Sequence, residues 1–141
     1  MKRLCTLLPF LLFCYCHCAI AQTFSSEERR KESECILNTV INSVPFDSIY
    51  NHKRVYFMAN ELLTKNSPLV LKRNKRKAKI LNENEVKKVK QYAILGDFTL
   101  DWNNPVAVRV QLSVSPNKTL NMRLEKEGER WIIKNHIVFE D

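Results

Sequence analysis

The chain has 141 residues, with 23 Lys or Arg against 15 Asp or Glu, so its formal net charge is +8 at pH 7. Two glycines in the whole sequence exclude a glycine-rich phosphate-binding loop. No grouping of carboxylates, histidines or cysteines has the spacing of a catalytic triad or a metal site, so the sequence specifies no reaction, no metal and no cofactor.

Residues 1–21 have the build of a secretory signal peptide. Two basic residues precede an apolar run from Leu4 to Ile20, and Ala19-Ile20-Ala21 supplies small residues for cleavage after Ala21. A transmembrane anchor is the first alternative, but the run is short for a bilayer and ends in the cleavage pattern. A lipoprotein signal is the second, although large side chains precede the cysteines of this segment. The sequence therefore predicts an exported protein, periplasmic or extracellular, without a membrane span after cleavage.

Removing the signal peptide leaves residues 22–141, which we expect to form one α+β domain. The net charge of this part is +6, because Lys2 and Arg3 are lost, and Cys35 is its only cysteine. An intramolecular disulfide is thereby excluded. Cys35 falls on the polar face of the predicted N-terminal helix, where it is either a tolerated free thiol or the site of an intermolecular disulfide.

The segment from Thr23 to Val44 predicts an amphipathic helix. Ser25 and Glu28 have the spacing of a capping box, and Pro45 is expected to end the helix. One apolar stripe runs along it, formed by Ile36, Leu37, Val40, Ile41 and Val44.

The middle of the chain is less regular. Residues 54–63 suit a strand followed by a short helix, and Pro68 to Leu71 suits a short edge strand. Asn82 is a candidate cap for a short helical turn up to Val89. Two short glycosylation patterns occur, Asp47-Ser48-Ile49, which resembles a bacterial O-glycosylation sequon, and Asn117-Lys118-Thr119, an N-glycosylation sequon.

The positive charge is concentrated in residues 72–90, which hold nine Lys or Arg and two Glu, a net charge of +7. Such a run is typical of a solvated hairpin or loop, here between Val70 and Ile80; the alternative is a surface for an anionic partner, such as a polysaccharide. Nucleic acid is not the expected partner, because no aromatic residues are interleaved with the basic ones. The candidate ligand-binding residues are Lys72, Arg73, Lys75, Arg76 and Lys77, with Trp102 in a later turn.

The last third of the chain predicts an antiparallel meander. Val106 to Val114 alternates strictly between apolar and other residues, and short turns separate it from similar runs before and after. A bulge or kink is expected at Gly96-Asp97. In the final strand we expect Trp131, Ile133, Ile137 and Phe139 on one face, with Ile132, His136 and Val138 on the other.

The ending Gly128-Glu129-Arg130-Trp131-Ile132-Ile133 resembles the closing hairpin of NTF2-like and cystatin-like domains, and the whole layout resembles small exported Bacteroidetes proteins. The resemblance implies a helix across a curved sheet, and a pocket between them. We therefore expect a non-catalytic binding or interaction module for an anionic surface, a polysaccharide or a protein. The alternative is an NTF2-like small-molecule-binding or hydrolytic domain, for which His52 and His136 are the available histidines.

Overall fold

The computed structural model describes residues 26–140, and the predicted signal peptide, its alternatives and Ser25 of the expected capping box lie outside this range. The fold is α+β, as predicted. The helices are α1 (Ser26–Ile41), α2 (Val44–Asp47) and α3 (Glu83–Val86). The strands are β1 (Tyr56–Met58), β2 (Lys72–Arg73), β3 (Arg76–Lys77), β4 (Lys79–Leu81), β5 (Ala93–Leu100), β6 (Ala107–Val114), β7 (Lys118–Glu127) and β8 (Arg130–Glu140).

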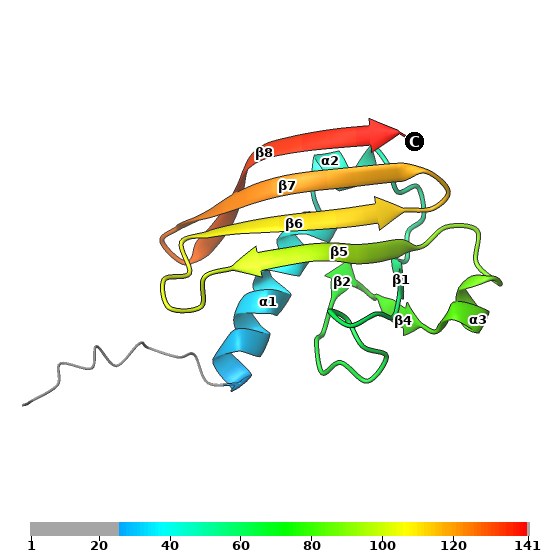
Figure 1. Cartoon of the computed structure of the whole chain (residues 1–141), viewed down its shortest axis with the longest axis horizontal. Coiled ribbons are helices and arrows are strands. Elements are labelled where there is room, and N and C mark those ends of the chain that lie inside the picture. Colours follow the sequence, from blue (N-terminus) through cyan, green and yellow to red (C-terminus); the bar gives the residue numbers. More distant parts are fainter. Residues whose placement is uncertain (1–25, 141) are drawn as a thin grey trace, which may run out of the picture.

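Six of the strands form one mixed sheet in the order β4-β1-β5-β6-β7-β8 (Figure 1). Strands β5 to β8 pair antiparallel with their sequence neighbours, which confirms the predicted meander. Strand β1 pairs parallel with both β4 and β5, and the sequence did not predict these parallel pairs. The separate pair β2–β3 is a small antiparallel hairpin.

The alternation predicted for β6 holds, because Val108, Val110, Leu112 and Val114 are all buried. Their cross-strand partners on β7 include the buried Leu120, Met122 and Leu124, so these residues form the core face of the sheet. Ile36, Leu37, Val40 and Ile41 of α1 belong to the same buried cluster. In Figure 1, α1 crosses behind the antiparallel strands. The opposite face of β5–β8 is called the outer face below.

Two irregularities shift the register of the sheet. The first, between Leu95 and Asp97, is the bulge predicted at Gly96. The second is in β8: Ile133 pairs with Leu124 and Asn135 pairs with Arg123, so Lys134 between them has no cross-strand partner. From Asn135 onward, each side chain of β8 therefore lies on the face opposite to the one expected from strict alternation. The predicted inward orientation of Ile137 and Phe139 is therefore wrong: they are 58% and 46% exposed, while His136 shares the face of Met122.

The helical predictions need smaller corrections. Helix α1 ends at Ile41, and Ser43 caps the separate helix α2, whose first turn contains Pro45. Val44 consequently leaves the apolar stripe and is 81% exposed. The capping role of Asn82 is confirmed, since its side chain accepts from the backbone of Glu85 while the Glu85 carboxylate accepts from the backbone of Asn82.

The expectations for the region before the hairpin were partly wrong. Strand β1 forms where a strand was expected, but no helix follows it, and residues 68–71 form no strand. The side chain of Asn60 explains part of this path, because it accepts from the backbone of Leu62 and Leu63 and donates to the carbonyl of Leu95. A local turn that a side chain stabilises takes the place of helical hydrogen bonds.

Candidate binding surfaces

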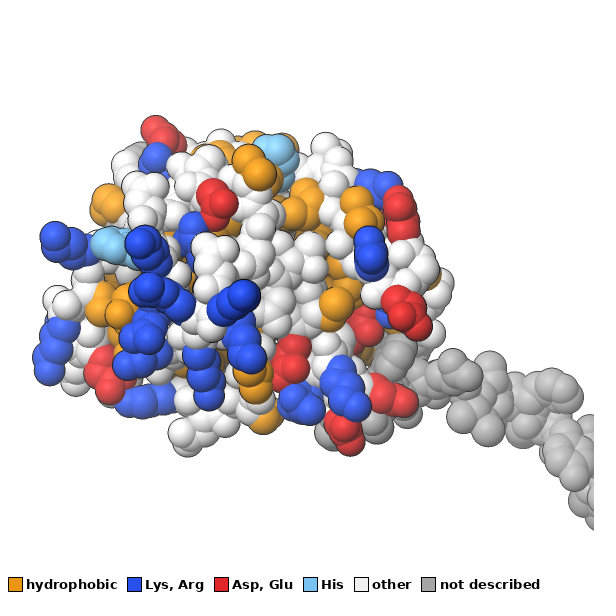
Figure 2. Space-filling view, turned by 180° about the vertical axis from the view of Figure 1, so that it is seen from behind, with side chains coloured by type: hydrophobic (Ala, Val, Ile, Leu, Met, Phe, Trp, Pro, Cys, Tyr) orange, Lys and Arg blue, Asp and Glu red, His pale blue; other side chains and the backbone are white. Residues whose placement is uncertain are grey.

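The basic run forms a tight hairpin rather than a loose loop. Asn74 and Lys75 occupy its turn with φ values of 49° and 67°, the left-handed region that two-residue hairpin turns require. The exposed side chains of the hairpin are all basic apart from Asn74; we call them the hairpin cations, Lys72, Lys75, Arg76 and Lys77. Figure 2 shows Lys and Arg side chains gathered on this side of the molecule.

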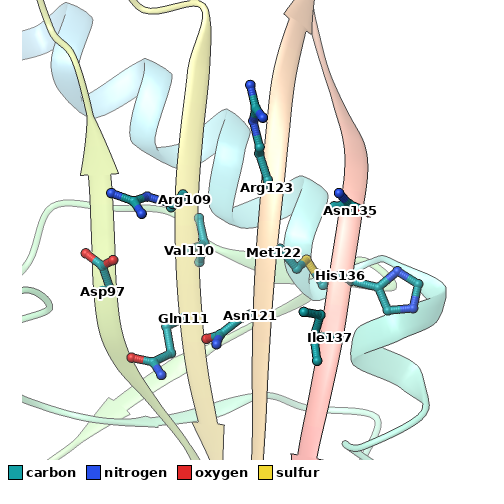
Figure 3. Close-up of a pocket in the computed structure, with 10 residues that line it drawn as sticks. All are labelled: Asp97, Arg109, Val110, Gln111, Asn121, Met122, Arg123, Asn135, His136 and Ile137. Atoms are coloured by element: carbon teal, nitrogen blue, oxygen red, sulfur yellow. The ribbon is translucent and has the colours of Figure 1, made fainter.

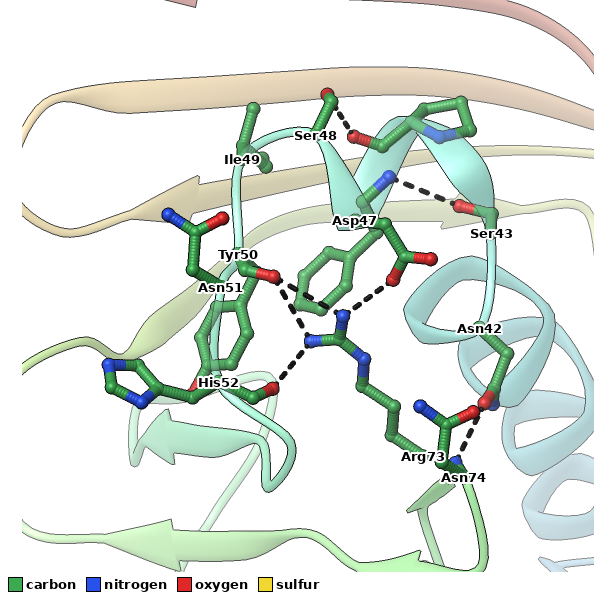
Figure 4. A network of polar contacts seen from close by, with 12 residues as sticks. Asn42, Ser43, Asp47, Ser48, Ile49, Tyr50, Asn51, His52, Arg73 and Asn74 are labelled. Atoms are coloured by element: carbon green, nitrogen blue, oxygen red, sulfur yellow. Dashed lines mark hydrogen bonds and ion pairs between the residues drawn. The ribbon is translucent and has the colours of Figure 1, made fainter.

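Arg73 is the exception, because its side chain points into the protein (Figure 4). It is 7% exposed, and its guanidinium donates to the carbonyl oxygens of Tyr50 and His52 and, at 2.5 Å, to the Asp47 carboxylate. The same guanidinium stacks on the rings of Phe46 and Tyr50, 5.3 and 5.4 Å from their centroids. The interpretation of Arg73 as a surface ligand residue is therefore revised: its Nη1 and Nη2 donors are used to hold the hairpin in place.

Two asparagines of α1 and its C-terminal turn hold the hairpin from the other side. The Asn38 amide accepts from the backbone N–H of Lys72 at 2.7 Å and donates to the carbonyl of Val70. The Asn42 amide donates to the carbonyl of Lys72 and accepts from the N–H of Asn74. Strand β2 and the turn of the hairpin are thus fixed to the body of the protein by side chains far away in sequence.

Two of the hairpin cations, Lys72 and Lys77, lie directly opposite each other. The register places Lys72 opposite Lys77 and Arg73 opposite Arg76. Like charges directly opposite each other destabilise a strand pair. Within the described residues, no ion pair neutralises any of the hairpin cations. The Glu85 carboxylate, from the same basic segment of the sequence, binds Lys65, which holds the pKa of Glu85 below its usual value. The fold therefore maintains an uncompensated positive surface.

A second site is an open groove of about 380 Å³ on the outer face of the sheet (Figure 3). Because cross-strand partners share a face, the register gives two rows across it, Thr99-Arg109-Arg123-Asn135 and Asp97-Gln111-Asn121-Ile137. Arg123 pairs with Glu125 at 2.9 Å, and Arg109 has no ion pair among the described residues. Sequence reasoning treated these positions, apart from Ile137, as ordinary outward polar residues, and only the register brings them together.

A third site lies between α1 and the sheet. A pocket of about 270 Å³ is lined by Ser33, Leu37, Leu62, Leu69, Leu95, Phe98 and Trp102. Trp102 stacks on Phe98 with 6.5 Å between ring centroids, and the Arg29 guanidinium lies 5.4 Å from its indole ring. The Trp102 indole is half-buried against the core, so it forms one wall of an apolar pocket.

The remaining candidates do not assemble into a catalytic or metal site. Cys35 is exposed, and partial burial together with the Glu32 carboxylate raises the pKa of its thiol. Its disulfide stays a prediction. His52 lies at the edge of the Tyr50 ring, while His136 is on β8. Between residues 26 and 140, no three His, Cys, Asp or Glu side chains stand together as metal ligands would, and no helix is long and apolar enough to cross a membrane.

Comparison of the chain with protein-family models, with curated proteins and with solved structures found no match. The three surfaces themselves are therefore the basis for inferring a function.

Proposed function

We propose that this protein is an exported, non-catalytic binding module whose hairpin cations engage an anionic partner. The proposal includes the architecture expected from the sequence, in which α1 covers the core face of the sheet and supports the hairpin. A single observation carries it: four exposed, unpaired cations project from a hairpin that is fixed by Arg73, Asn38 and Asn42.

Rigid presentation distinguishes this surface from a solvated charge run. A flexible basic tail loses conformational entropy when it binds, whereas a fixed hairpin has already lost most of it. An anion that binds between Lys72 and Lys77 also relieves their mutual repulsion. Exposed lysines also follow in sequence: Lys79 on β4, and Lys87, Lys88 and Lys90 after α3.

A sulfated or carboxylated polysaccharide is the partner that we favour. Such a chain presents anions at regular intervals and needs no base stacking, which suits a surface without exposed aromatic side chains. Lysine-rich surfaces bind by charge and impose little geometric selectivity, in contrast to arginine clamps. We therefore expect binding to depend strongly on salt.

Changing Lys72, Lys75, Arg76 and Lys77 to Ser should weaken binding to immobilised heparin. Each cation near an anionic surface contributes about 1 kcal/mol, so losing four should weaken binding at low salt by at least about 100-fold. The measurement is the salt concentration of elution, with Arg73 kept so that the hairpin stays anchored.

The matched control changes Arg109, Arg123, Arg130 and Lys134 to Ser. These residues are exposed and carry the same total charge, but they lie on β6, β7 and β8. We expect this variant to elute close to the parent protein. Equal losses in both variants would show that net charge alone causes retention, and the proposed surface would have to be abandoned.

The alternative function is binding of a small apolar molecule in the pocket between α1 and β5. The apolar lining favours it, and the absence of a histidine or carboxylate from that lining offers no support for hydrolysis.

A neutral fluorescent probe such as N-phenylnaphthylamine tests this alternative. Leu62 is 51% exposed at the pocket rim, so Leu62→Glu should abolish probe binding without unfolding the protein. Val70→Glu is the control, because Val70 is 38% exposed but does not line the pocket. Probe fluorescence that is unchanged in Leu62→Glu would exclude this pocket as the binding site.

A further inference from the structure

The two edges of the six-stranded sheet differ sharply in length and protection. Strand β4 forms one edge with three residues, begins with Lys79 and leads directly into α3. Strand β8 forms the other edge with eleven residues, and nothing among the described residues pairs with its free side (Figure 1). Long exposed edge strands are templates for pairing with another chain, and natural sheets protect them with prolines, charges or bulges.

The protection of β8 covers only its first half. The bulge at Lys134, together with the charge of this residue, interrupts the edge near the middle of the strand. The following stretch, 136–140, contains neither Pro nor Lys, and its sequence is His-Ile-Val-Phe-Glu. Ile137, Val138 and Phe139 are exposed by 58%, 37% and 46%. An apolar edge of this kind is costly in an isolated monomer.

We infer that two copies of this protein associate by antiparallel pairing of their β8 strands about a two-fold axis at Val138. An antiparallel strand pair joins residues of the same face. With Val138 at the axis, Ile137 of one copy lies opposite Phe139 of the other, and both belong to the outer face. His136 lies opposite Glu140, and both belong to the core face. The stretch is therefore self-complementary in face and in polarity.

The backbone agrees with this register. The two-residue turn Gly128-Glu129 makes Glu127 and Arg130 the closing hydrogen-bonded pair of the β7–β8 hairpin. Hydrogen-bonded and non-hydrogen-bonded pairs alternate along an antiparallel ladder, so on β7 residues 125, 123, 121 and 119 follow as the bonded positions. Their partners beyond the bulge are Asn135, Ile137 and Phe139. The N–H and C=O groups of His136, Val138 and Glu140 then point away from β7, as pairing about Val138 requires.

A second copy fits this edge better than an unrelated strand does. A palindromic pattern places an apolar pair on each side of the axis and an imidazole opposite a carboxylate at both ends. Glu140 already contacts Lys118 at 3.0 Å on its own sheet. His136 of the second copy would therefore meet a carboxylate that is already held in position. The association would also place Phe139 of the second copy beside Ile137, which lines the groove on the outer face. This inference does not depend on the hairpin cations, which lie on another element.

Sedimentation equilibrium of the purified protein, with reductant present, tests the inference. We expect a dimer in the parent protein, and Val138→Lys should raise its dissociation constant at least about tenfold, because two lysines then face each other at the axis. Ile132→Lys is the matched control: Ile132 is also 37% exposed and lies on the same strand, but before the bulge. It should leave the dimer unchanged.

Cross-linking tests the register without relying on a destabilising change. In a Cys35→Ser background, Ile137→Cys combined with Phe139→Cys should give a covalent dimer on oxidation. Ile132→Cys combined with Phe139→Cys should not, because these positions are far apart in the proposed pairing. A monomeric parent protein, or a dimer equally lost in Ile132→Lys, would overturn the inference. A dimer that disappears on reduction would instead be the disulfide dimer through Cys35.

Discussion

Replacing Arg73 with Met is expected to lower the free energy of unfolding by about 2–4 kcal/mol. The methionine keeps much of the side-chain volume but leaves the buried carbonyl of Tyr50 and that of His52 without their donor. An unsatisfied buried polar group costs about 1–3 kcal/mol. The stacking of the guanidinium on Phe46 and Tyr50 is lost as well. Urea denaturation followed by far-ultraviolet circular dichroism measures the change.

Two variants make the Arg73 prediction specific. Arg73→Lys keeps the charge but cannot reach Asp47, Tyr50 and His52 with one planar fork, so it should recover only part of the loss. Arg76 is the cross-strand partner of Arg73, and its own side chain is exposed. Arg76→Met should therefore alter the free energy of unfolding by less than about 0.5 kcal/mol. Equal effects of the changes at positions 73 and 76 would contradict the anchoring role.

Arg73 also shows where sequence reasoning reaches its limit. Its neighbours in the basic run are chemically alike, and nothing local separates the one buried arginine from the exposed cations. The difference comes from Asp47 and Tyr50, which lie 26 and 23 residues away in sequence. Charge counting grouped Arg73 with the exposed cations, whereas its side chain is buried.

In the sheet, too, some features are determined by residues close together in sequence and others by residues far apart. The alternation in β6, the turn at Gly128 with φ of 61° and the bulge at Gly96 follow from local chemistry, and the sequence predicted all three positions. Strands β1 and β4 have three residues each, too few for a periodic signal, and their parallel pairing depends on contacts far apart in sequence. The Lys134 bulge has no local marker, although it decides which side chains of β8 face outward.

Among substitutions that remove buried apolar packing, Trp131→Ala is expected to have the largest effect. It should lower the free energy of unfolding by about 3–5 kcal/mol. The Trp131 side chain is 3% exposed in the core cluster, and its indole N–H donates to the Glu32 carboxylate at 2.6 Å. The same carboxylate oxygen accepts from the Lys126 ammonium at 2.7 Å, and that ammonium lies 5.7 Å from the indole centroid. Glu32 thus joins α1 to both β7 and β8 through two donors.

Separating the packing of Trp131 from its hydrogen bond requires a double-mutant cycle. Trp131→Phe keeps most of the buried surface and removes the donor, so it should cost about 1–2 kcal/mol. Glu32→Ala should cost a similar amount because it removes the acceptor for both Trp131 and Lys126. If the two groups interact as described, the combined variant should lose less than the sum of the single changes, by about 1 kcal/mol. Strict additivity would mean that the Trp131 indole and the Glu32 carboxylate do not interact, and any cost of Glu32→Ala would then come from its contact with Lys126.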